Sequence, residues 1–398
     1  MNVNMNIVRL SSALAIVAAA ALTGCGGGGG GGIGGTGGAP GTLHLAITDA
    51  PSCGYDAVNI TIEKVRVNQS ADAADGDAGW SEITLSPAKR IDLLTLSNGV
   101  LQDLGQTSLP AGKYTQLRLV LAVNGGATPL ANSVVPTGGV ETALTTPSAQ
   151  QSGIKLNTDI DVASNQVADF VLDFDACKSV VTRGNSGQYN LKPVISVIPR
   201  LSDAGMRVIG YVDASIVGSG TSISLQSNGV PVKATPPDAS GQFVLYPVPV
   251  GTYDLVVTST GHVTAVMTGV PVVSTAYTYV NSSALAIAPP AAASAPRTVT
   301  GTVTPPTATV RALQPLTGGP TIESAWAPVD AISGVFSTSL PIQAPVRTAY
   351  VASPAALAFT PDAGAAGKYT IEATSAGVVK TLPIDVSASV PPLSFSFP

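Results

Sequence analysis

The chain has 398 residues, which is enough for two or three domains of ordinary size. It carries 19 basic and 24 acidic residues, so only 11% of the chain is charged, against about 25% in an average soluble protein. The formal charge of −5, with no Lys/Arg cluster longer than a dipeptide, excludes a typical nucleic-acid-binding protein. Two histidines and three cysteines leave few general bases and few metal ligands.

The N-terminus has the pattern of a secretory signal. Arg9 provides a positive charge, residues 10–22 form a short apolar run, and Leu-Thr-Gly precedes Cys25. This pattern resembles the bacterial lipobox, in which the chain is cut before the cysteine and the cysteine carries a lipid. The resemblance predicts a signal peptide over 1–24 and a lipid on Cys25. The alternative is an ordinary secretory signal with a chance cysteine.

The segment after Cys25 indicates where the protein is held. Gly26, and not an aspartate, follows the cysteine, so the lipoprotein resemblance implies the outer membrane of a bacterial cell envelope. Residues 26–32 are all glycine, and glycine at this density behaves as a flexible coil. We therefore predict a tether over 25–40 that holds the folded part roughly 20 Å from the membrane.

Residues 41–203 have the pattern of a mostly β domain. Apolar and polar residues alternate with the period of half-buried strands over 42–48, 57–67 and 116–121. The best candidate for a helix is 91–104, and Asn98-Gly99 interrupts it.

Five segments of this domain, taken in order, suggest a family. They are 45–51 (LAITDAP), 58–67 (VNITIEKVRV), 112–121 (GKYTQLRLVL), 170–176 (FVLDFDA) and 191–195 (LKPVI). Together they resemble a bacterial lipoprotein family known as domain of unknown function 4382, over about 160 residues. The resemblance implies a β-rich, surface-anchored module. It brings no catalytic residues, because the family has no established activity.

Clustered aspartates form one candidate site in this domain. In an extended strand over 167–175, the aspartates and the apolar side chains project from opposite faces. If 156–162 pairs with that strand as a hairpin, further carboxylates join the row. Clustered carboxylates suit Ca²⁺, the one cofactor that the sequence suggests. The candidate ligands are Asp159, Asp161, Asp169, Asp173 and Asp175. The alternative is a solvated face balanced by Lys or Arg on neighbouring strands.

A second acidic stretch, residues 72–80, lacks the alternating ligands and the final glutamate of an EF-hand. We predict a hydrophilic hairpin loop there. Trp80 then starts the next strand, as a core residue rather than a platform for sugar.

Two cysteines remain after Cys25, and both lie in the first domain. In an oxidising compartment they predict a disulfide between Cys53 and Cys177, with two free structural thiols as the alternative. A catalytic thiol would need a base. His44 lies in a predicted strand, where a structural imidazole is expected, and His262 belongs to another domain.

Residues 204–283 contain a Gly-Gln-Phe strand at 241–243 and a Pro-Val-Gly-Thr-Tyr turn at 249–253. They resemble the carboxypeptidase regulatory-like domain, a prealbumin-like seven-stranded β-sandwich related to starch-binding-like folds. The resemblance implies a spacer or a carbohydrate-binding-like module and no enzyme. Sugar binding would need exposed aromatic platforms. The candidates, which are also suited to a core, are Tyr211, Tyr246, Tyr277 and Tyr279.

An Ala/Pro linker over 284–296 precedes the last unit, residues 297–398. Residues 297–303 repeat the opening of the previous unit, and 367–372 repeat its Gly-x-Tyr turn and strand. We therefore predict a degenerate second copy of the β-sandwich.

The whole sequence predicts an all-β protein of tandem β-sandwich-like domains behind a lipoprotein signal and a glycine-rich tether. The expected function is a lipid-anchored, non-enzymatic cell-envelope protein with a binding, adhesion or structural role. Its expected partners are the membrane, through the lipid, and a polysaccharide or an envelope protein, but no nucleic acid. The alternatives are a carbohydrate-binding surface protein, a Ca²⁺-binding module and a hydrolase. A hydrolase has the least support, since nothing resembles Gly-x-Ser-x-Gly and the two histidines leave almost no nucleophile–base pair.

Overall fold

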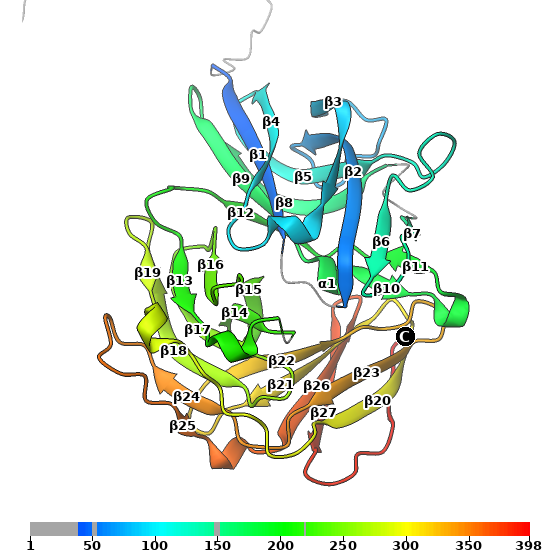
Figure 1. The fold of residues 1–398 in the computed structure, drawn as a ribbon. Coiled ribbons are helices and arrows are strands. Elements are labelled where there is room, and N and C mark those ends of the chain that lie inside the picture. Colours follow the sequence, from blue (N-terminus) through cyan, green and yellow to red (C-terminus); the bar gives the residue numbers. More distant parts are fainter. Residues whose placement is uncertain (1–38, 50–53, 147–151, 219) are drawn as a thin grey trace, which may run out of the picture. The chain divides into compact units, whose positions relative to one another are not determined.

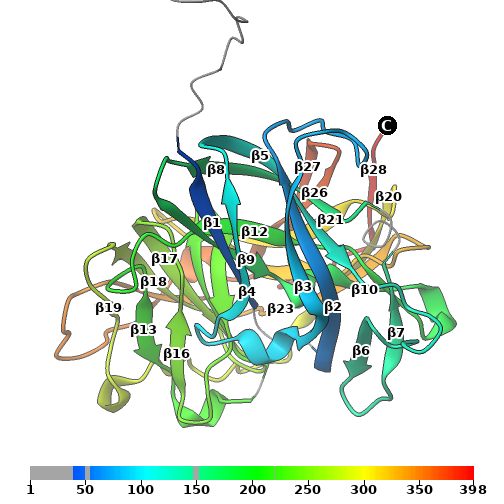
Figure 2. The ribbon, with the colours of Figure 1, turned by 90° about the horizontal axis from the view of Figure 1, so that it is seen from above.

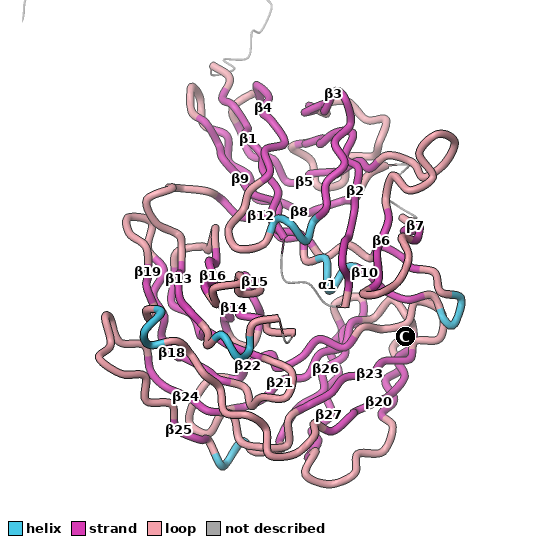
Figure 3. The backbone as a smooth tube through the Cα atoms, in the orientation of Figure 1, coloured by secondary structure: helices cyan, strands magenta, loops and turns pink. Residues whose placement is uncertain are grey.

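Strands make up most of the computed structural model, which describes residues 39–49, 54–146, 152–218 and 220–398 (Figure 3). The prediction of an all-β fold with sandwich-like domains is confirmed. The signal peptide, Cys25 and nearly all of the tether lie outside the described residues. None of the helices in the described part of the chain combines the length and the apolar character that crossing a membrane requires.

The N-terminal sheet pair comprises the twelve strands between residues 41 and 199 (Figure 1). Its first sheet has the order β12-β9-β1-β4, with β1 (Gly41–Asp49), β4 (Gln102–Leu109), β9 (Val167–Phe174) and β12 (Ile195–Pro199). Its second sheet has the order β10-β11-β7-β6-β2-β5-β8, with β3 paired to β2. The strands are β2 (Tyr55–Asn68), β3 (Ser81–Asp92), β5 (Gly112–Leu121), β6 (Ser133–Pro136), β7 (Thr142–Thr145), β8 (Ile154–Val162), β10 (Val180–Thr182) and β11 (Tyr189–Leu191).

Alternation builds the core between these two sheets. Leu43, Leu45 and Ile47 of β1 are fully buried, and so are Leu117 and Leu119 of β5. The predicted strands over 42–48, 57–67 and 116–121 all exist, and Figure 2 shows β2 and β3 side by side as long strands. The loop between β2 and β3 confirms the predicted hairpin over 72–80.

Two expectations for this region change. The helix candidate over 91–104 becomes the end of β3, the 3-10 helix η1 (Leu93–Leu96) and a turn in which Asn98 and Gly99 have positive φ. The hairpin of 156–162 with 167–175, which was the condition for a longer row of carboxylates, does not form. β8 pairs with β5 in one sheet, whereas β9 pairs with β1 and β12 in the other.

The middle sandwich follows. Its sheets have the orders β16-β13-β19 and β15-β14-β17-β18-β24-β25. Its own strands are β13 (Val208–Tyr211), β14 (Ser222–Ser227), β15 (Val230–Thr235), β16 (Gln242–Leu245), β17 (Gly251–Thr258), β18 (Ala265–Val272) and β19 (Thr278–Tyr279).

The C-terminal sandwich has sheets of the orders β23-β20-β28 and β22-β21-β26-β27. Its strands are β20 (Arg297–Thr304), β21 (Thr309–Pro315), β22 (Thr321–Ala327), β23 (Val335–Leu340), β26 (Lys368–Ser375), β27 (Val378–Asp385) and β28 (Leu393–Ser396). Besides η1, the short helices of the described residues are α1 (Ala176–Ser179), η2 (Gly184–Ser186), η3 (Ala214–Ile216), η4 (Ser283–Leu285) and η5 (Ala363–Ala365).

The two sandwiches repeat one topology. In each, the first strand pairs antiparallel with the fourth and parallel with the last, and the other four strands have equivalent positions in the second sheet. Between β23 and β26, however, β24 (Val346–Ala349) and β25 (Thr360–Pro361) leave the C-terminal sandwich. β24 pairs in parallel with β18, so the C-terminal segment extends a sheet of the middle sandwich.

Candidate functional site

The five candidate aspartates have different partners. Asp159 and Asp161 of β8 lie beside Lys113 of β5. Lys113 Nζ is 2.6 Å from Asp159 Oδ1, and Lys113 pairs in register with Asp161. The hydrogen bond to Asp159, together with the charge of Asp161, raises the pKa of Lys113.

Asp169 of β9 lies between two basic side chains. Its Oδ1 is 2.9 Å from His44 Nδ1, and its Oδ2 accepts from Arg200 Nε at 2.8 Å. His44 Nε2 is 3.0 Å from Asp103 Oδ1, so each ring nitrogen has a carboxylate oxygen within hydrogen-bond distance. An imidazole held on both sides has no nitrogen left to activate a nucleophile, which agrees with the structural role expected for His44.

Asp173 forms a buried ion pair that the sequence did not indicate. Its partner is Lys233 of β15 in the middle sandwich, which also donates to the backbone carbonyl of Asp49 at 3.3 Å. The exposed fractions of the two side chains are 1% for Lys233 and 9% for Asp173. The sequence feature that could have pointed to a buried ion pair is Lys233 itself, which stands at a buried position of β15 in a region with few charges.

Asp175 begins α1, and its Oδ1 accepts from the backbone N–H of Lys178 at 3.0 Å. Lys178 Nζ lies 3.8 Å from Asp175 and 2.9 Å from Glu323 of β22. Burial raises the pKa of Asp175, while Lys178 opposes the increase and the carboxylates of Asp173 and Glu323 add to it.

These partners divide the predicted calcium ligands among separate ion pairs. Asp159, Asp161 and Asp169 line one hollow of about 710 Å³, but Arg200 lines it as well. Asp173 and Asp175 lie elsewhere, beside Lys233 and Lys178. Within the described ranges, no group of three or more His, Cys, Asp or Glu residues has the arrangement that a metal ion requires.

Trp80, at the end of the 72–80 loop, has two arginine guanidinium groups near its ring. The guanidinium carbons of Arg66 and Arg118 are 4.6 and 4.8 Å from its ring centroid, and Trp80 Nε1 donates to the carbonyl of Ala74 at 2.9 Å. The ring is only partly buried, so it is not the core residue that the sequence predicted. Its contacts with two cations also make it a poor platform for sugar.

The predicted disulfide falls partly outside the described residues, because Cys53 lies there. Cys177 is half-buried in α1 and is not a free residue. The pairing of Cys53 with Cys177 remains a prediction.

The four candidate tyrosines separate by exposure. Tyr246 is buried and Tyr211 is partly buried, whereas the exposed fractions are 40% for Tyr277 and 55% for Tyr279. The rings of Tyr277 and Tyr279 meet edge to face, with centroids 6.5 Å apart. The guanidinium carbon of Arg207 lies 4.2 Å from the ring centroid of Tyr246 and 5.1 Å from that of Tyr277. Tyr277 and Tyr279 thus form an exposed aromatic pair that Arg207 supports from one side.

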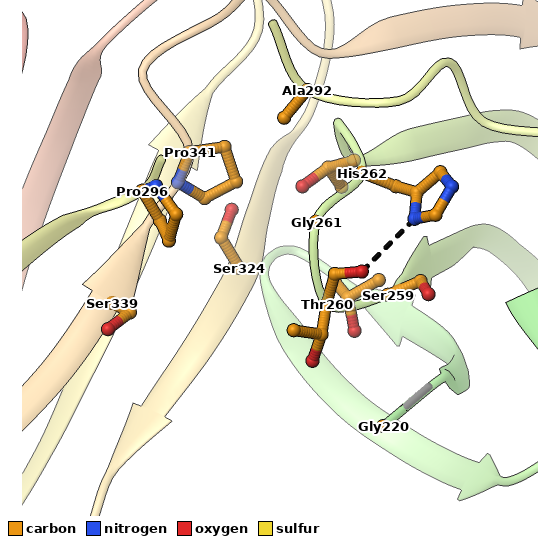
Figure 4. A pocket seen from close by; sticks show the side chains of 12 residues that line it. Gly220, Ser259, Thr260, Gly261, His262, Ala292, Pro296, Ser324, Ser339 and Pro341 are labelled. Carbon is orange, nitrogen blue, oxygen red and sulfur yellow. Dashed lines mark hydrogen bonds between the residues drawn. The ribbon is translucent and has the colours of Figure 1, made fainter. Parts of the chain in front are cut away.

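A small hollow of about 220 Å³ lies between the middle and C-terminal sandwiches. Figure 4 shows the 259–262 loop facing Ser324 and Pro341 across it. His262 Nδ1 is 3.1 Å from the carbonyl of Thr260, and the other polar lining groups are mainly hydroxyls. Such a lining offers hydrogen bonds to a small neutral molecule.

Comparisons with known proteins give one match to a family model. Residues 40–193 match the model of a domain of unknown function, DUF4382, which confirms the resemblance found in the sequence for that part of the chain. No curated protein matches the chain.

Two solved structures show a weak likeness. They are an N-terminal and a C-terminal interface mutant of a type II cohesin–X-dockerin complex from Acetivibrio cellulolyticus. The identities are 25% and 23%, and the TM-scores are 0.20 and 0.19. In both cases the likeness covers 23% of this chain and 61% of the other, so this chain spans less than two thirds of those proteins.

Proposed function

We propose that this chain is a lipid-anchored, non-enzymatic protein of the bacterial cell envelope, held at the outer membrane, with a binding, adhesion or structural role. The observation that carries the proposal is the order of segments. A lipobox-like sequence ends at Cys25, glycines follow over 26–32, and strands begin at Gly41. A lipid, a flexible spacer and a rigid β-rich body are the parts that surface presentation needs.

Within this proposal, residues 41–203 are the first domain and 204–283 a prealbumin-like β-sandwich. The linker over 284–296 then leads to a second sandwich over 297–398. A disulfide between Cys53 and Cys177 would close a loop of the first domain and stabilise it outside the cytoplasm. The position of His44 between two carboxylates supports a non-enzymatic role, because it leaves this base no free ring nitrogen.

The anchor is tested by expressing the full chain and its Cys25→Ala variant in a Gram-negative host. Mass spectrometry of the mature N-terminus should find acyl chains on Cys25 of the wild type and none in the variant, which should also leave the membrane fraction. An unmodified N-terminus on wild-type protein would overturn the anchor.

A second candidate function is saccharide binding by the middle sandwich, and the exposed pair of Tyr277 and Tyr279 favours it. Aromatic faces of this kind offer apolar area together with a polar edge. Retention of the full chain on a polysaccharide array should be lost in Tyr277→Ala and Tyr279→Ala. It should persist in Val250→Ala, which changes an exposed apolar residue of the same sandwich. Equal retention by all variants would remove this candidate.

A further inference from the structure

A second groove, of about 580 Å³, lies between the N-terminal sheet pair and the C-terminal sandwich. Its lining includes Ser152, Lys155, Asn190 and Lys192 of the N-terminal sheet pair and Thr307 and Ala331 of the C-terminal sandwich. Among its described lining residues there are two lysines and no aspartate or glutamate. The volume falls within the range of about 300–1,000 Å³ that is common for small-molecule sites. We call this feature the Lys155–Lys192 groove.

Two backbone carbonyls hold Lys192 in place, and none of the described residues supplies it with a counter-ion. Its Nζ donates to the backbone carbonyls of Thr307 and Ala308, the latter at 2.9 Å. Within the described chain no carboxylate lies within 4 Å of it, and burial lowers its pKa. An anion in the groove would offset this loss of solvation, because an opposite charge favours the protonated amine.

Lys155 extends a row of cations across the second sheet. It is the register partner of Arg118 on β5, which is itself the register partner of Arg66 on β2. Asp75 lies near both arginines, whereas no carboxylate of the described residues lies within 4 Å of Lys155. Like charges directly opposite one another weaken a sheet, and an anion beside Lys155 would reduce this repulsion.

Asn190 supplies an independent sign of a missing partner. Its Oδ1 is buried and has no hydrogen-bond partner among the described residues. A buried acceptor of this kind costs about 1–3 kcal/mol when it remains unsatisfied. A hydroxyl group of a molecule in the groove would satisfy Asn190 Oδ1 by donating a hydrogen bond to it.

We propose that the Lys155–Lys192 groove binds an acidic sugar residue. The carboxylate or phosphate of the sugar lies between Lys155 Nζ and Lys192 Nζ, and a sugar hydroxyl donates to Asn190 Oδ1. Both acidic groups present oxygens that accept charge-assisted hydrogen bonds from ammonium groups. A polysaccharide that carries uronic acids and one that carries phosphate would both offer this chemistry. The groove is separate from the Tyr277–Tyr279 pair, so this inference does not depend on the saccharide site suggested there.

The test is ligand-observed NMR on the full chain in detergent at low salt. The probes are glucuronate, glucose 6-phosphate, glucose and inorganic phosphate. We expect one or both acidic sugars to bind at least tenfold more tightly than glucose or inorganic phosphate. Which of the two binds more tightly identifies the acidic group. Binding should weaken in 0.5 M NaCl, because salt screens the two lysines.

Variants distinguish binding in the groove from nonspecific electrostatic attraction to the protein surface. Lys155→Gln should weaken binding of the acidic sugar at least fivefold, and Asn190→Leu should remove the advantage of the sugar over inorganic phosphate. Lys89→Gln is the matched control. It is a lysine of the same sheet pair that donates to the carbonyl of Asp103, has no carboxylate partner among the described residues, and does not line the groove.

Three results would overturn the proposal. They are wild-type protein that binds none of the probes, Lys155→Gln that binds like wild type, and Lys89→Gln that weakens binding as much as Lys155→Gln. Lys192→Gln is not used alone, because Lys192 also ties the C-terminal sandwich to the N-terminal sheet pair.

Discussion

At the scale of single residues, the ion pair of Lys233 with Asp173 predicts the largest loss of stability on substitution. Both side chains are nearly inaccessible. Lys233→Met leaves the carboxylate of Asp173 buried without its partner, which should cost about 3–5 kcal/mol of unfolding free energy. Urea unfolding measures the loss. Lys64→Gln, which breaks a half-exposed pair with Glu82, should cost about 1 kcal/mol or less. Similar losses in the two variants would contradict the buried pair.

Asp330 predicts a dependence of stability on pH. Its Oδ1 accepts from the backbone of Ser333 and Ile332, and its Oδ2 accepts from the backbone N–H of Gly184 at 2.5 Å. Burial alone would raise the pKa of Asp330, but these hydrogen bonds outweigh it and lower the pKa well below the ordinary 3.8. A carboxylate with a lowered pKa in the folded state stabilises above the unfolded pKa and loses this effect as pH falls.

We therefore expect Asp330→Asn to cost about 1–2 kcal/mol at pH 7. Its unfolding free energy should then fall less than that of wild type between pH 4 and pH 2. Asp72→Asn, a change at an exposed position of the 72–80 loop, should leave both quantities as in wild type. A parallel acid profile for Asp330→Asn and wild type would contradict this role.

Single residues also show what could not be predicted from the sequence. The strand carrying Asp169 and Asp173 was visible from alternation, but the partners of these carboxylates were not. Lys233 lies 60 residues from Asp173, in a different sheet, and nothing local in the sequence relates the two. A metal site was a reasonable prediction from the carboxylates alone, because the cations that separate them come from other parts of the chain.

At the scale of elements, equivalent glycines support the repeat of the two sandwiches. A Cβ on Gly241 would lie 2.3 Å from the carbonyl of Val212, and one on Gly334 would lie 2.2 Å from that of Val303. Both glycines have positive φ and precede a strand with a buried phenylalanine, Phe243 or Phe336. The sequence predicted this repeat from short motifs. It did not predict β24, whose partner is an edge strand of the preceding sandwich and not a neighbour in sequence.

The close backbone contact at Gly241 predicts a loss of stability when a side chain is added there. Gly241→Ala should cost about 3 kcal/mol or more, because an unfavourable φ adds to a clash with backbone. Gly269→Ala is the matched control in the same sandwich, since Gly269 has a similar φ of 77° and open space around it. It should cost about 1–2 kcal/mol. Equal losses in thermal or urea unfolding would show that the close approach to Val212 has no energetic weight.

At the scale of the whole molecule, Glu323 connects the three groups of sheets. Its carboxylate lies 2.9 Å from Lys178 of the N-terminal sheet pair and 3.4 Å from Arg311 of its own sandwich. Its backbone N–H donates to Gln226 of the middle sandwich at 2.7 Å, and its carbonyl accepts from the same side chain at 2.9 Å. Buried polar links of this kind make separate unfolding of the groups unfavourable, because each would leave unpaired charges behind.

We therefore expect wild-type protein to unfold in one transition and Glu323→Gln to separate the transitions. The chain has two tryptophans, Trp80 in the N-terminal sheet pair and Trp326 in the C-terminal sandwich, so Trp80→Phe and Trp326→Phe each leave one fluorescent reporter. In urea the two reporters should give coincident curves with Glu323 present and different midpoints with Glu323→Gln. Lys64→Gln, whose ion pair lies within the N-terminal sheet pair, should keep the curves coincident. Coincident curves in Glu323→Gln would mean that the groups are coupled through other contacts, such as Lys233 with Asp173.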